Sequence, residues 1–574
     1  MPAFAAEPVN LGQLWSLAAP LWLTFWGLVV LLLDVALMRG ASSPSRRKRL
    51  GLLSLLGPIG VLVLLLTPLL VPSEVVSDPD PTLFYGTIAG DLLTQSFHAL
   101  IALLLAMVLG LSLTWDFTEH WGPYYALMLW AGVGMMILVS AEELLILLIS
   151  LEMMTICLYL ASAFEKSRLR SSEAGMKYFV YGSVCSALFL FGLSLIYGLT
   201  GTTHLDGIRK VLLDRVGGEV SLGLAGDVLG GTAVLLVLVG FGFKIAAVPF
   251  HQWAPDTYEG APAPVSAWIA SGSKVAGFVA LMKVFLHALG PWAGTAGTEG
   301  AGGWVLILAL IAAITMTFGN LAALGQRNLK RLLAYSSIAH AGYILVGVVA
   351  AAVTIRVGST RGETAGSVLF YLVIYSLTTV GAFAVAAWLA SDKGRDDIDD
   401  LNGLGFSSPG LAACIVVLML SLIGMPPTAG FFAKLYLFLE VLNADPTARP
   451  LLLTLVALAL VNSVISAFYY ARVLRAMFLR QGDRAPKPAT RGVAWPIGLA
   501  TLVALGFGLA PTPLLDAMRT AGSSMLAITL PATDLDRDRE RSAPAAIPSA
   551  ATANPESAPT FAPAPRIATA HRRP

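Results

Sequence analysis

Apolar residues are grouped along this chain in long runs separated by short polar stretches. Each run is about 20 residues long, enough at about 1.5 Å of rise per residue for a helix to cross a hydrocarbon core of roughly 30 Å. The pattern predicts an all-α integral membrane protein with about 14 transmembrane helices. The predicted spans lie near residues 14–38, 50–71, 92–114, 123–140, 143–164, 173–199, 229–256, 263–289, 303–323, 329–352, 366–391, 411–441, 450–478 and 493–518.

Prolines interrupt the seventh and the twelfth of these spans. The seventh contains Pro249 and then Pro255, and the twelfth contains the stretch GMPPTAG with Pro426 and Pro427. Proline removes a backbone hydrogen-bond donor and clashes with the preceding turn, so we expect both helices to break or kink there. Ordinary proline enrichment of membrane helices is an alternative explanation.

The two interrupted spans lie five spans apart, which suggests a pair of five-helix units at 123–289 and 303–478. Because five is odd, the second unit would enter the membrane from the opposite side, and the two units would form inverted repeats. Residues 1–122 would hold the first three helices and 493–518 the last one. Residues 531–574 are rich in Pro and Ala and too polar to bury, so we expect a disordered tail.

Lysine and arginine mark one end of the spans. Basic loops follow span one (45–49), span five (165–170), span nine (326–331) and span thirteen (472–484), and alternation places all four on the same face. Positive residues are retained on the cytoplasmic side during insertion, so both termini are predicted to be periplasmic. The loop near 204–215, which is also basic, is the main exception.

The composition excludes several classes of function. Hydrophobic residues make up 56% of the chain and charged residues 13%, as expected of a membrane protein. The net charge of +2 provides no field that would recruit nucleic acid or an acidic substrate. Cys157, Cys185 and Cys414 lack metal-ligand spacing, so we expect small buried side chains and no metal site.

Charged residues nevertheless occur in the middle of several spans. Lys244, Lys274 and Lys434 lie deep within spans seven, eight and twelve, Glu152 lies within span five, and His340 lies halfway along span ten. A charge at a helix centre costs about 2.5–3.5 kcal/mol on insertion scales. We therefore expect these side chains to face one another or a hydrated cavity, although His340 alone could be an ordinary packing residue.

Other charged residues have simpler explanations. Lys283 and Glu440 lie close to helix ends, so we expect their charged groups to extend to the membrane surface. Glu142 and Glu143 precede a helix, where carboxylates are favoured by the helix dipole and the interface.

The central residues suggest a proton relay. A carboxylate that approaches or leaves a buried lysine changes how tightly that lysine holds its proton. Glu152 and Lys244 could form such a pair, and the broken helix beside Lys244 would supply hydrated backbone. The sequence therefore predicts proton transfer along a line of buried lysines.

Three stretches resemble the antiporter-like membrane subunits of respiratory complex I: GFGFKIAAVPFHQWAPDTYEGAPAPVSAWIASGSKVAGF (240–278), NLAALGQRNLKRLLAYSSIAHAGYILVG (320–347) and LSLIGMPPTAGFFAKLYLF (420–438). The resemblance extends from about residue 12 to 518. Two branches of this family have lysine in the twelfth span, as this chain does. One of the two has a long lateral helix after its transmembrane spans; fourteen spans with no such helix after them favour the other branch.

The resemblance implies a proton-translocating subunit of the membrane arm in the bacterial inner membrane, with Glu152, Lys244, Lys274, His340 and Lys434 in the proton path. It also implies that NAD, FMN, iron–sulfur clusters and quinone are used by partner subunits. The chain itself has no Gly-x-Gly-x-x-Gly after a strand and no cysteine cluster. The partners would be other membrane-arm subunits, including paralogous antiporter-like ones, and lipid.

Two alternatives remain open. A subunit of a multi-subunit sodium/proton antiporter would share the same helices and lysines, although sodium prefers oxygen ligands and Glu152 is the only mid-membrane carboxylate predicted. In a purely structural arm subunit, the lysines would only form pairs.

Overall fold

The computed structural model describes residues 17–38, 40–67, 82–83, 86–114, 116–215, 228–294, 302–357, 363–391, 396–442, 446–480 and 490–527. All of them belong to one compact unit, Met1–Thr529. The predicted tail at 531–574 and both termini lie outside the described residues.

Thirteen helices in the described part of the chain are long and apolar enough to cross a membrane. They are α2 (Ala18–Leu37), α3 (Ser43–Leu66), α4 (Leu92–Ser112), α5 (Trp121–Ser140), α6 (Leu144–Ser162), α7 (Leu169–Thr200), α9 (Val228–Ile245), the continuous run Ala263–Ala288, α13 (Trp304–Leu324), α14 (Leu329–Val357), α15 (Glu363–Ala390), α19 (Arg449–Leu479) and α20 (Arg491–Leu509). This confirms the prediction of an all-helical membrane protein. The run Ala263–Ala288 consists of α11 (Ala263–Trp268), η3 (Ile269–Ser273), α12 (Lys274–Met282) and η4 (Lys283–Ala288).

The remaining predicted span, 411–441, is two shorter helices in the structure. Helix α17 (Pro409–Ile423) ends at Gly424, and α18 (Ala429–Leu442) follows the two prolines. Gly424 has φ 86°, which a side chain would strain, and an added Cβ would lie 2.9 Å from Lys434 Cδ. Likewise, α9 ends at Ile245 and α10 (Trp253–Gly260) begins after Pro249.

The last predicted span, 493–518, also differs in extent. Helix α20 ends at Leu509, and a further helix, α21 (Thr512–Ala527), follows Pro511. Proline at that position cannot continue the hydrogen-bond ladder of α20. Helix α21 packs against α15 instead of extending the span.

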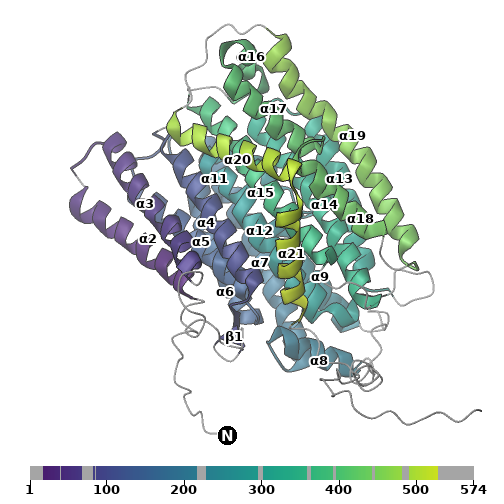
Figure 1. Cartoon of the computed structure of the whole chain (residues 1–574). Coiled ribbons are helices and arrows are strands. Elements are labelled where there is room, and N and C mark those ends of the chain that lie inside the picture. The colour runs from purple at the N-terminus through teal and green to yellow at the C-terminus, as the bar shows by residue number, and fades with distance from the viewer. Residues whose placement is uncertain are drawn as a thin grey trace, which may run out of the picture. The chain divides into compact units, whose positions relative to one another are not determined.

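Short elements cover the two ends of the helices. Helix α8 (Leu205–Arg215) and the hairpin of β1 (Thr82–Leu83) and β2 (Ile88–Ala89) lie at one end (Figure 1). Helix α16 (Leu404–Ser407) lies at the other end, with η6 (Ile398–Leu401) close by in the chain. The remaining short helix is η5 (Gly290–Trp292).

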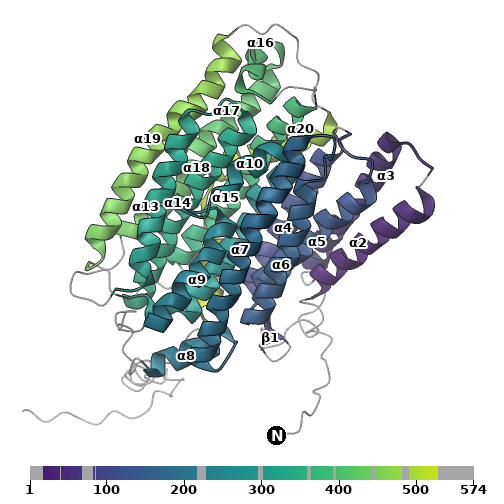
Figure 2. The ribbon, with the colours of Figure 1, turned by 180° about the vertical axis from the view of Figure 1, so that it is seen from behind.

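The core lies around three segments. The apolar windows of Ala263–Ala288, α14 and α15 are completely buried, whereas those of α2, α3, α7 and α19 are buried by a third or less. Figures 1 and 2 both place α2 and α3 on one flank and α19 on the opposite flank. Lys274 and His340 are therefore carried by the most enclosed segments.

Candidate functional site

The predicted lysines and histidine are all enclosed. Lys244, Lys274, His340 and Lys434 are between 1% and 6% exposed. Glu152 differs, because it is half-buried on α6 beside α7. The cost of burying these cations is reduced by hydrogen-bond acceptors from neighbouring helices.

Lys244 is held by α6. Its Nζ donates to the hydroxyl of Thr155, which in turn donates to the carbonyl of Leu151 at 2.5 Å. Glu152 lies one turn before Thr155 and accepts a hydrogen bond from Ser186 Oγ of α7 at 2.5 Å. Within the described residues, the hydrogen-bond partner of Glu152 is thus Ser186 and that of Lys244 is Thr155. The direct partner of Lys244 is therefore the hydroxyl of Thr155, whereas the sequence suggested the carboxylate of Glu152.

The broken segment after Lys244 has partners for its backbone. The N–H of Val248 donates to Thr315 Oγ1 of α13 at 3.0 Å, and the indole of Trp253 donates to the carbonyl of Phe243 at 3.1 Å. The break at Pro249 is tolerated within the membrane because these contacts replace helical hydrogen bonds.

Lys274 is held by α14. Its Nζ donates to the carbonyl of Ser337 at 2.6 Å and to the hydroxyl of Ser337 at 2.5 Å. The same hydroxyl accepts from Tyr375 on α15 at 2.8 Å. An added Cβ at Gly277, one turn beyond Lys274, would lie 3.5 Å from the Cβ of Lys244. The helices carrying the first two lysines are therefore in close contact.

His340 lies between Lys274 and Lys434. Its Nδ1 is 2.9 Å from the hydroxyl of Tyr371, and its ring centroid is 5.0 Å from that of Tyr375. A cavity of about 10 Å³ is lined by His340, Lys434 and Ser421, among others. Its volume is about that needed for one water molecule, and its lining combines apolar side chains such as Ile374 and Leu422 with these polar ones.

Lys434 lies immediately after the break between α17 and α18. Its Nζ donates to the carbonyl of Ile423, the last residue of α17, at 2.7 Å and to Ser463 Oγ of α19 at 3.0 Å. It also lies 4.7 Å from the ring centroid of Tyr343. A cation at the carboxyl end of a helix is favoured by the helix dipole, so the break itself helps to hold this lysine.

Two predictions about charges near helix ends are wrong. Lys283 does not extend to the membrane surface, because its Nζ forms a 2.6 Å ion pair with Glu142 and its side chain is 3% exposed. Glu440 is also buried and pairs with Arg519 of α21 at 3.2 Å. In both cases the partner comes from a distant part of the chain. Glu143 does cap α6 as predicted, accepting from the N–H of Ile146 at 3.2 Å.

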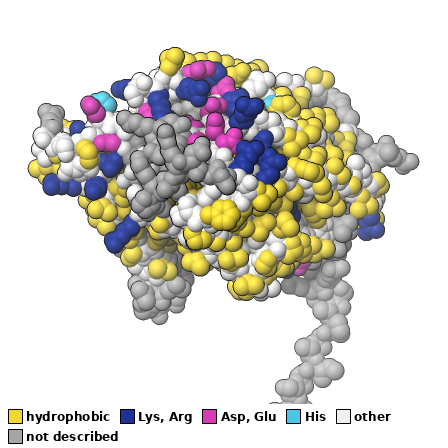
Figure 3. Space-filling model, turned by 90° about the horizontal axis from the view of Figure 1, so that it is seen from above, with side chains coloured by type: hydrophobic (Ala, Val, Ile, Leu, Met, Phe, Trp, Pro, Cys, Tyr) yellow, Lys and Arg dark blue, Asp and Glu magenta, His cyan; other side chains and the backbone are white. Residues whose placement is uncertain are grey.

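Acidic and basic side chains gather on the face of the molecule shown in Figure 3. The residues of α10 form several ion pairs with neighbouring helices. Asp256 pairs with Lys177 and with Arg331 at 2.6 Å each. Glu259 pairs with Arg331 at 2.9 Å and with Arg170 at 3.4 Å. Burial of Asp256 opposes its ionisation, but the hydrogen bonds from Lys177 and Arg331 outweigh this effect and lower its pKa. These ion pairs attach the short helix beyond the break to α7 and α14.

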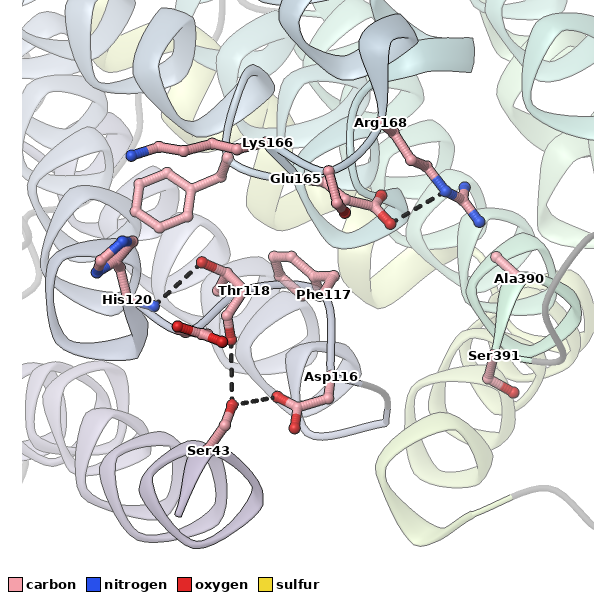
Figure 4. A pocket seen from close by; sticks show the side chains of 13 residues that line it. Ser43, Asp116, Phe117, Thr118, His120, Glu165, Lys166, Arg168, Ala390 and Ser391 are labelled. Atoms are coloured by element: carbon pink, nitrogen blue, oxygen red, sulfur yellow. Dashed lines mark hydrogen bonds and ion pairs between the residues drawn. The ribbon is translucent and has the colours of Figure 1, made fainter. Parts of the chain in front are cut away.

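A separate cavity of about 860 Å³ is shown in Figure 4. Ser43, Asp116, Glu165 and Arg168 are among its lining residues, and Glu165 pairs with Arg168 at 3.1 Å. Burial raises the pKa of Glu165 although Arg168 opposes the shift.

Known proteins resemble this chain in sequence and in fold. The sequence profile described as "NADH:quinone oxidoreductase/Mrp antiporter, TM" matches residues 141–466. The chain belongs to this family. It is 39% identical over 440 residues to NADH-quinone oxidoreductase subunit N of Desulfitobacterium hafniense, covering 74% of this chain and 83% of that protein.

Two further relatives of this family member are informative. F(420)H(2) dehydrogenase subunit N of Methanosarcina mazei is 37% identical over 526 residues, covering 89% of this chain and 98% of that protein. A chain in the structure of respiratory complex I from Thermus thermophilus with bound Aureothin is 32% identical, with a TM-score of 0.69, covering 87% of this chain and 99% of that chain. The chain is thus an antiporter-like membrane subunit of the subunit N type.

No group of three or more His, Cys, Asp or Glu side chains suited to a metal ion occurs within the residues the structure describes. Cys157 and Cys185 are buried, and Cys414 is half-buried.

Proposed function

We propose that this chain translocates protons in the membrane arm of an NADH-quinone oxidoreductase through Glu152, Lys244, Lys274, His340 and Lys434. Membership of the family supports the activity. The observation that carries the residue assignment is the depth of the three lysines, each buried and each bound to a hydroxyl on a neighbouring helix.

The contacts suggest how a proton would pass. Lys274 would exchange protons with the Ser337 hydroxyl, which is already bonded to Tyr375. His340 would receive the proton beside Tyr375 and pass it to Lys434 through a water in the 10 Å³ cavity. Lys434 would release it near the break between α17 and α18.

The finer architecture belongs to the same proposal. If α17, the break and α18 count as one interrupted span, the chain has fourteen spans, and 123–289 and 303–478 form inverted five-helix repeats. The protein would lie in a bacterial inner membrane beside paralogous antiporter-like subunits. Quinone reduction in partner subunits, with NAD, FMN and iron–sulfur clusters, would drive transport. This chain would supply proton-carrying side chains only.

The test is proton uptake by vesicles containing the complete complex, measured during NADH oxidation. Lys244→Ala should lower the protons moved per NADH oxidised. Unchanged transport in an assembled complex would favour the structural alternative.

The same preparation tests the antiporter alternative. A complex purified through this chain should contain redox subunits and oxidise NADH. Sodium-dependent proton exchange without any redox partner would favour the antiporter. Because a similar subunit N occurs in an F(420)H(2) dehydrogenase, oxidation of F(420)H(2) instead of NADH would change the electron donor and leave the proton path as proposed.

A further inference from the structure

Asn320 of α13 joins three helices beside Lys434. Its Nδ2 donates to the hydroxyl of Tyr343 on α14 at 2.9 Å and to Oδ1 of Asn462 on α19 at 3.3 Å. Its Oδ1 accepts from the hydroxyl of Tyr469 on α19 at 3.1 Å. The side chain of Asn320 is fully buried, so its hydrogen-bonding capacity is used inside the protein.

Backbone carbonyls determine which way the two amides point. Nδ2 of Asn320 donates to the carbonyl of Met316 at 2.8 Å, and Nδ2 of Asn462 donates to the carbonyl of Leu458 at 2.9 Å. A carbonyl can only accept a hydrogen bond, so each amide must present its nitrogen to it. The oxygen of Asn462 is then left to accept from Asn320, and the oxygen of Asn320 is left to accept from Tyr469.

Helices α13 and α14 lie very close together at this point. A Cβ added at Gly319, the residue before Asn320, would lie 2.6 Å from a backbone nitrogen of α14. A Cβ added at Gly342, the residue before Tyr343, would lie 2.5 Å from a backbone nitrogen of α13. Small residues allow two helix backbones to approach in this way. The hydrogen bond between Asn320 and Tyr343 therefore joins two closely packed backbones and holds the tyrosine ring in one position.

Two of the groups that contact Lys434 are held through Asn320. The first is the ring of Tyr343, whose centroid lies 4.7 Å from Nζ of the lysine and whose hydroxyl accepts from Asn320. The second is the hydroxyl of Ser463, which accepts from Nζ at 3.0 Å. Ser463 follows Asn462 directly on α19, so the hydrogen bond between the two amides holds the segment that carries it.

We propose that Asn320 is a positioning residue for proton exchange at Lys434. It holds the Tyr343 ring and the Ser463 hydroxyl against the ammonium, which stabilises the protonated lysine and keeps it beside the cavity that it shares with His340. A cation on an aromatic face and bonded to a hydroxyl holds its proton more tightly than one without these contacts. Asn320 itself exchanges no proton. This proposal rests on the proton relay proposed above.

The other polar groups near Lys434 come from four helices. They are His340 and Tyr343 of α14, Tyr371 and Tyr375 of α15, Ser421 of α17 and Ser463 of α19. Helix α20, which also packs against α18, carries a titratable group only at its first residue, Arg491. The charge of Lys274 acts on His340. A substitution at Asn320 leaves all of these groups in the chain, so a changed pH dependence would report on how Lys434 is held.

The decisive variant is Asn320→Leu in the complete complex reconstituted in vesicles. Leucine has the same branching as asparagine and makes no side-chain hydrogen bond. Protons moved per NADH oxidised are measured across a pH series, because transport falls at a pH high enough to leave Lys434 unprotonated. We expect this fall to occur about one pH unit lower in the variant. A wild-type pH profile in the assembled variant overturns the proposal.

A second variant tests the link itself and covers the case in which Asn320→Leu does not assemble. Tyr343→Phe keeps the ring and removes the hydroxyl, so it should shift the profile in the same direction. The double variant should shift it no further than Asn320→Leu alone, because both substitutions break the same hydrogen bond. A wild-type profile in Tyr343→Phe, or shifts that add in the double variant, would reject the positioning role.

The matched control is Tyr124→Phe. Tyr124 is fully buried, and its hydroxyl lies 2.8 Å from Ser112 Oγ at the contact between α4 and α5. This control also removes a buried tyrosine hydroxyl, so it should lower the thermal midpoint of the complex. It should leave the pH profile of transport unchanged, and an equal shift in the control would attribute the effect to stability and overturn the proposal.

Lys434→Met separates this proposal from the proposed function. If Lys434→Met abolishes transport while Asn320→Leu and Tyr343→Phe keep the wild-type profile, the relay stands and the positioning role is rejected. If Lys434→Met also retains transport, the relay itself fails.

Discussion

Replacement of Lys434 by methionine should abolish proton transport without preventing folding. In the structure, Nζ makes two hydrogen bonds, to the carbonyl of Ile423 at 2.7 Å and to Ser463 Oγ at 3.0 Å, and lies 4.7 Å from the Tyr343 ring. Each hydrogen bond to a charged group is worth about 1.5–3 kcal/mol, so the variant forfeits roughly 3–6 kcal/mol.

An opposing effect of similar size comes from the removed charge. A lysine at a helix centre costs about 2.5–3.5 kcal/mol on insertion scales, and methionine avoids that cost while filling much of the same volume. The two effects partly cancel, so we expect the free energy of unfolding to fall by roughly 0–3.5 kcal/mol. The transport defect would then reflect the missing proton carrier.

The assay compares proton uptake per NADH oxidised in vesicles with the thermal midpoint of the purified complex. Lys434→Arg is the matched control for charge, because it keeps the cation but holds its proton too tightly to exchange it. It should fold normally and transport poorly. Normal transport in both variants would refute the relay, whereas loss of assembly in Lys434→Met would refute the calculated cancellation.

Three further predictions concern other positions. Gly424→Ala should destabilise the complex by about 1 kcal/mol or more, because Gly424 has a positive φ and an added Cβ would contact the side chain of Lys434. The control is Gly410→Ala, whose added Cβ meets nothing within 4 Å and should leave stability unchanged. Thermal unfolding measures both effects. Ser337→Ala should slow proton transport without abolishing it, because Lys274 still donates to the backbone carbonyl of residue 337. If the variant and the wild type transported protons at the same rate, the proposed role of the Ser337 hydroxyl would be contradicted. The pKa of Asp256 is lower in the folded protein than the ordinary carboxyl pKa of about 3.9. Its ionised carboxylate therefore stabilises the fold at any pH above about 3.9, and this stabilisation is lost as the pH falls through the pKa of the folded state. The thermal midpoint of Asp256→Asn should therefore lie below that of the wild type at pH 7, and this difference should narrow below about pH 4.

The sequence alone determined which segments enter the membrane and at what depth their charges lie. Depth depends on counting residues along one helix at a constant rise, so the positions of Lys244, Lys274 and Lys434 in the middle of their spans could be predicted without knowing any neighbour. The positions of the breaks followed in the same way from Pro249 and Pro426, because proline acts on its own turn.

Only the tertiary structure decided what each buried group faces. Thr155 at Lys244, Ser337 at Lys274 and Ser463 at Lys434 lie between 29 and 89 residues from their lysines. Lys283 pairs with Glu142, which lies 141 residues away in the chain. From the sequence, its charged group was expected at the membrane surface. Which side of a helix meets which neighbour depends on how all the helices pack together, and depth along a single helix contains no information about that rotation.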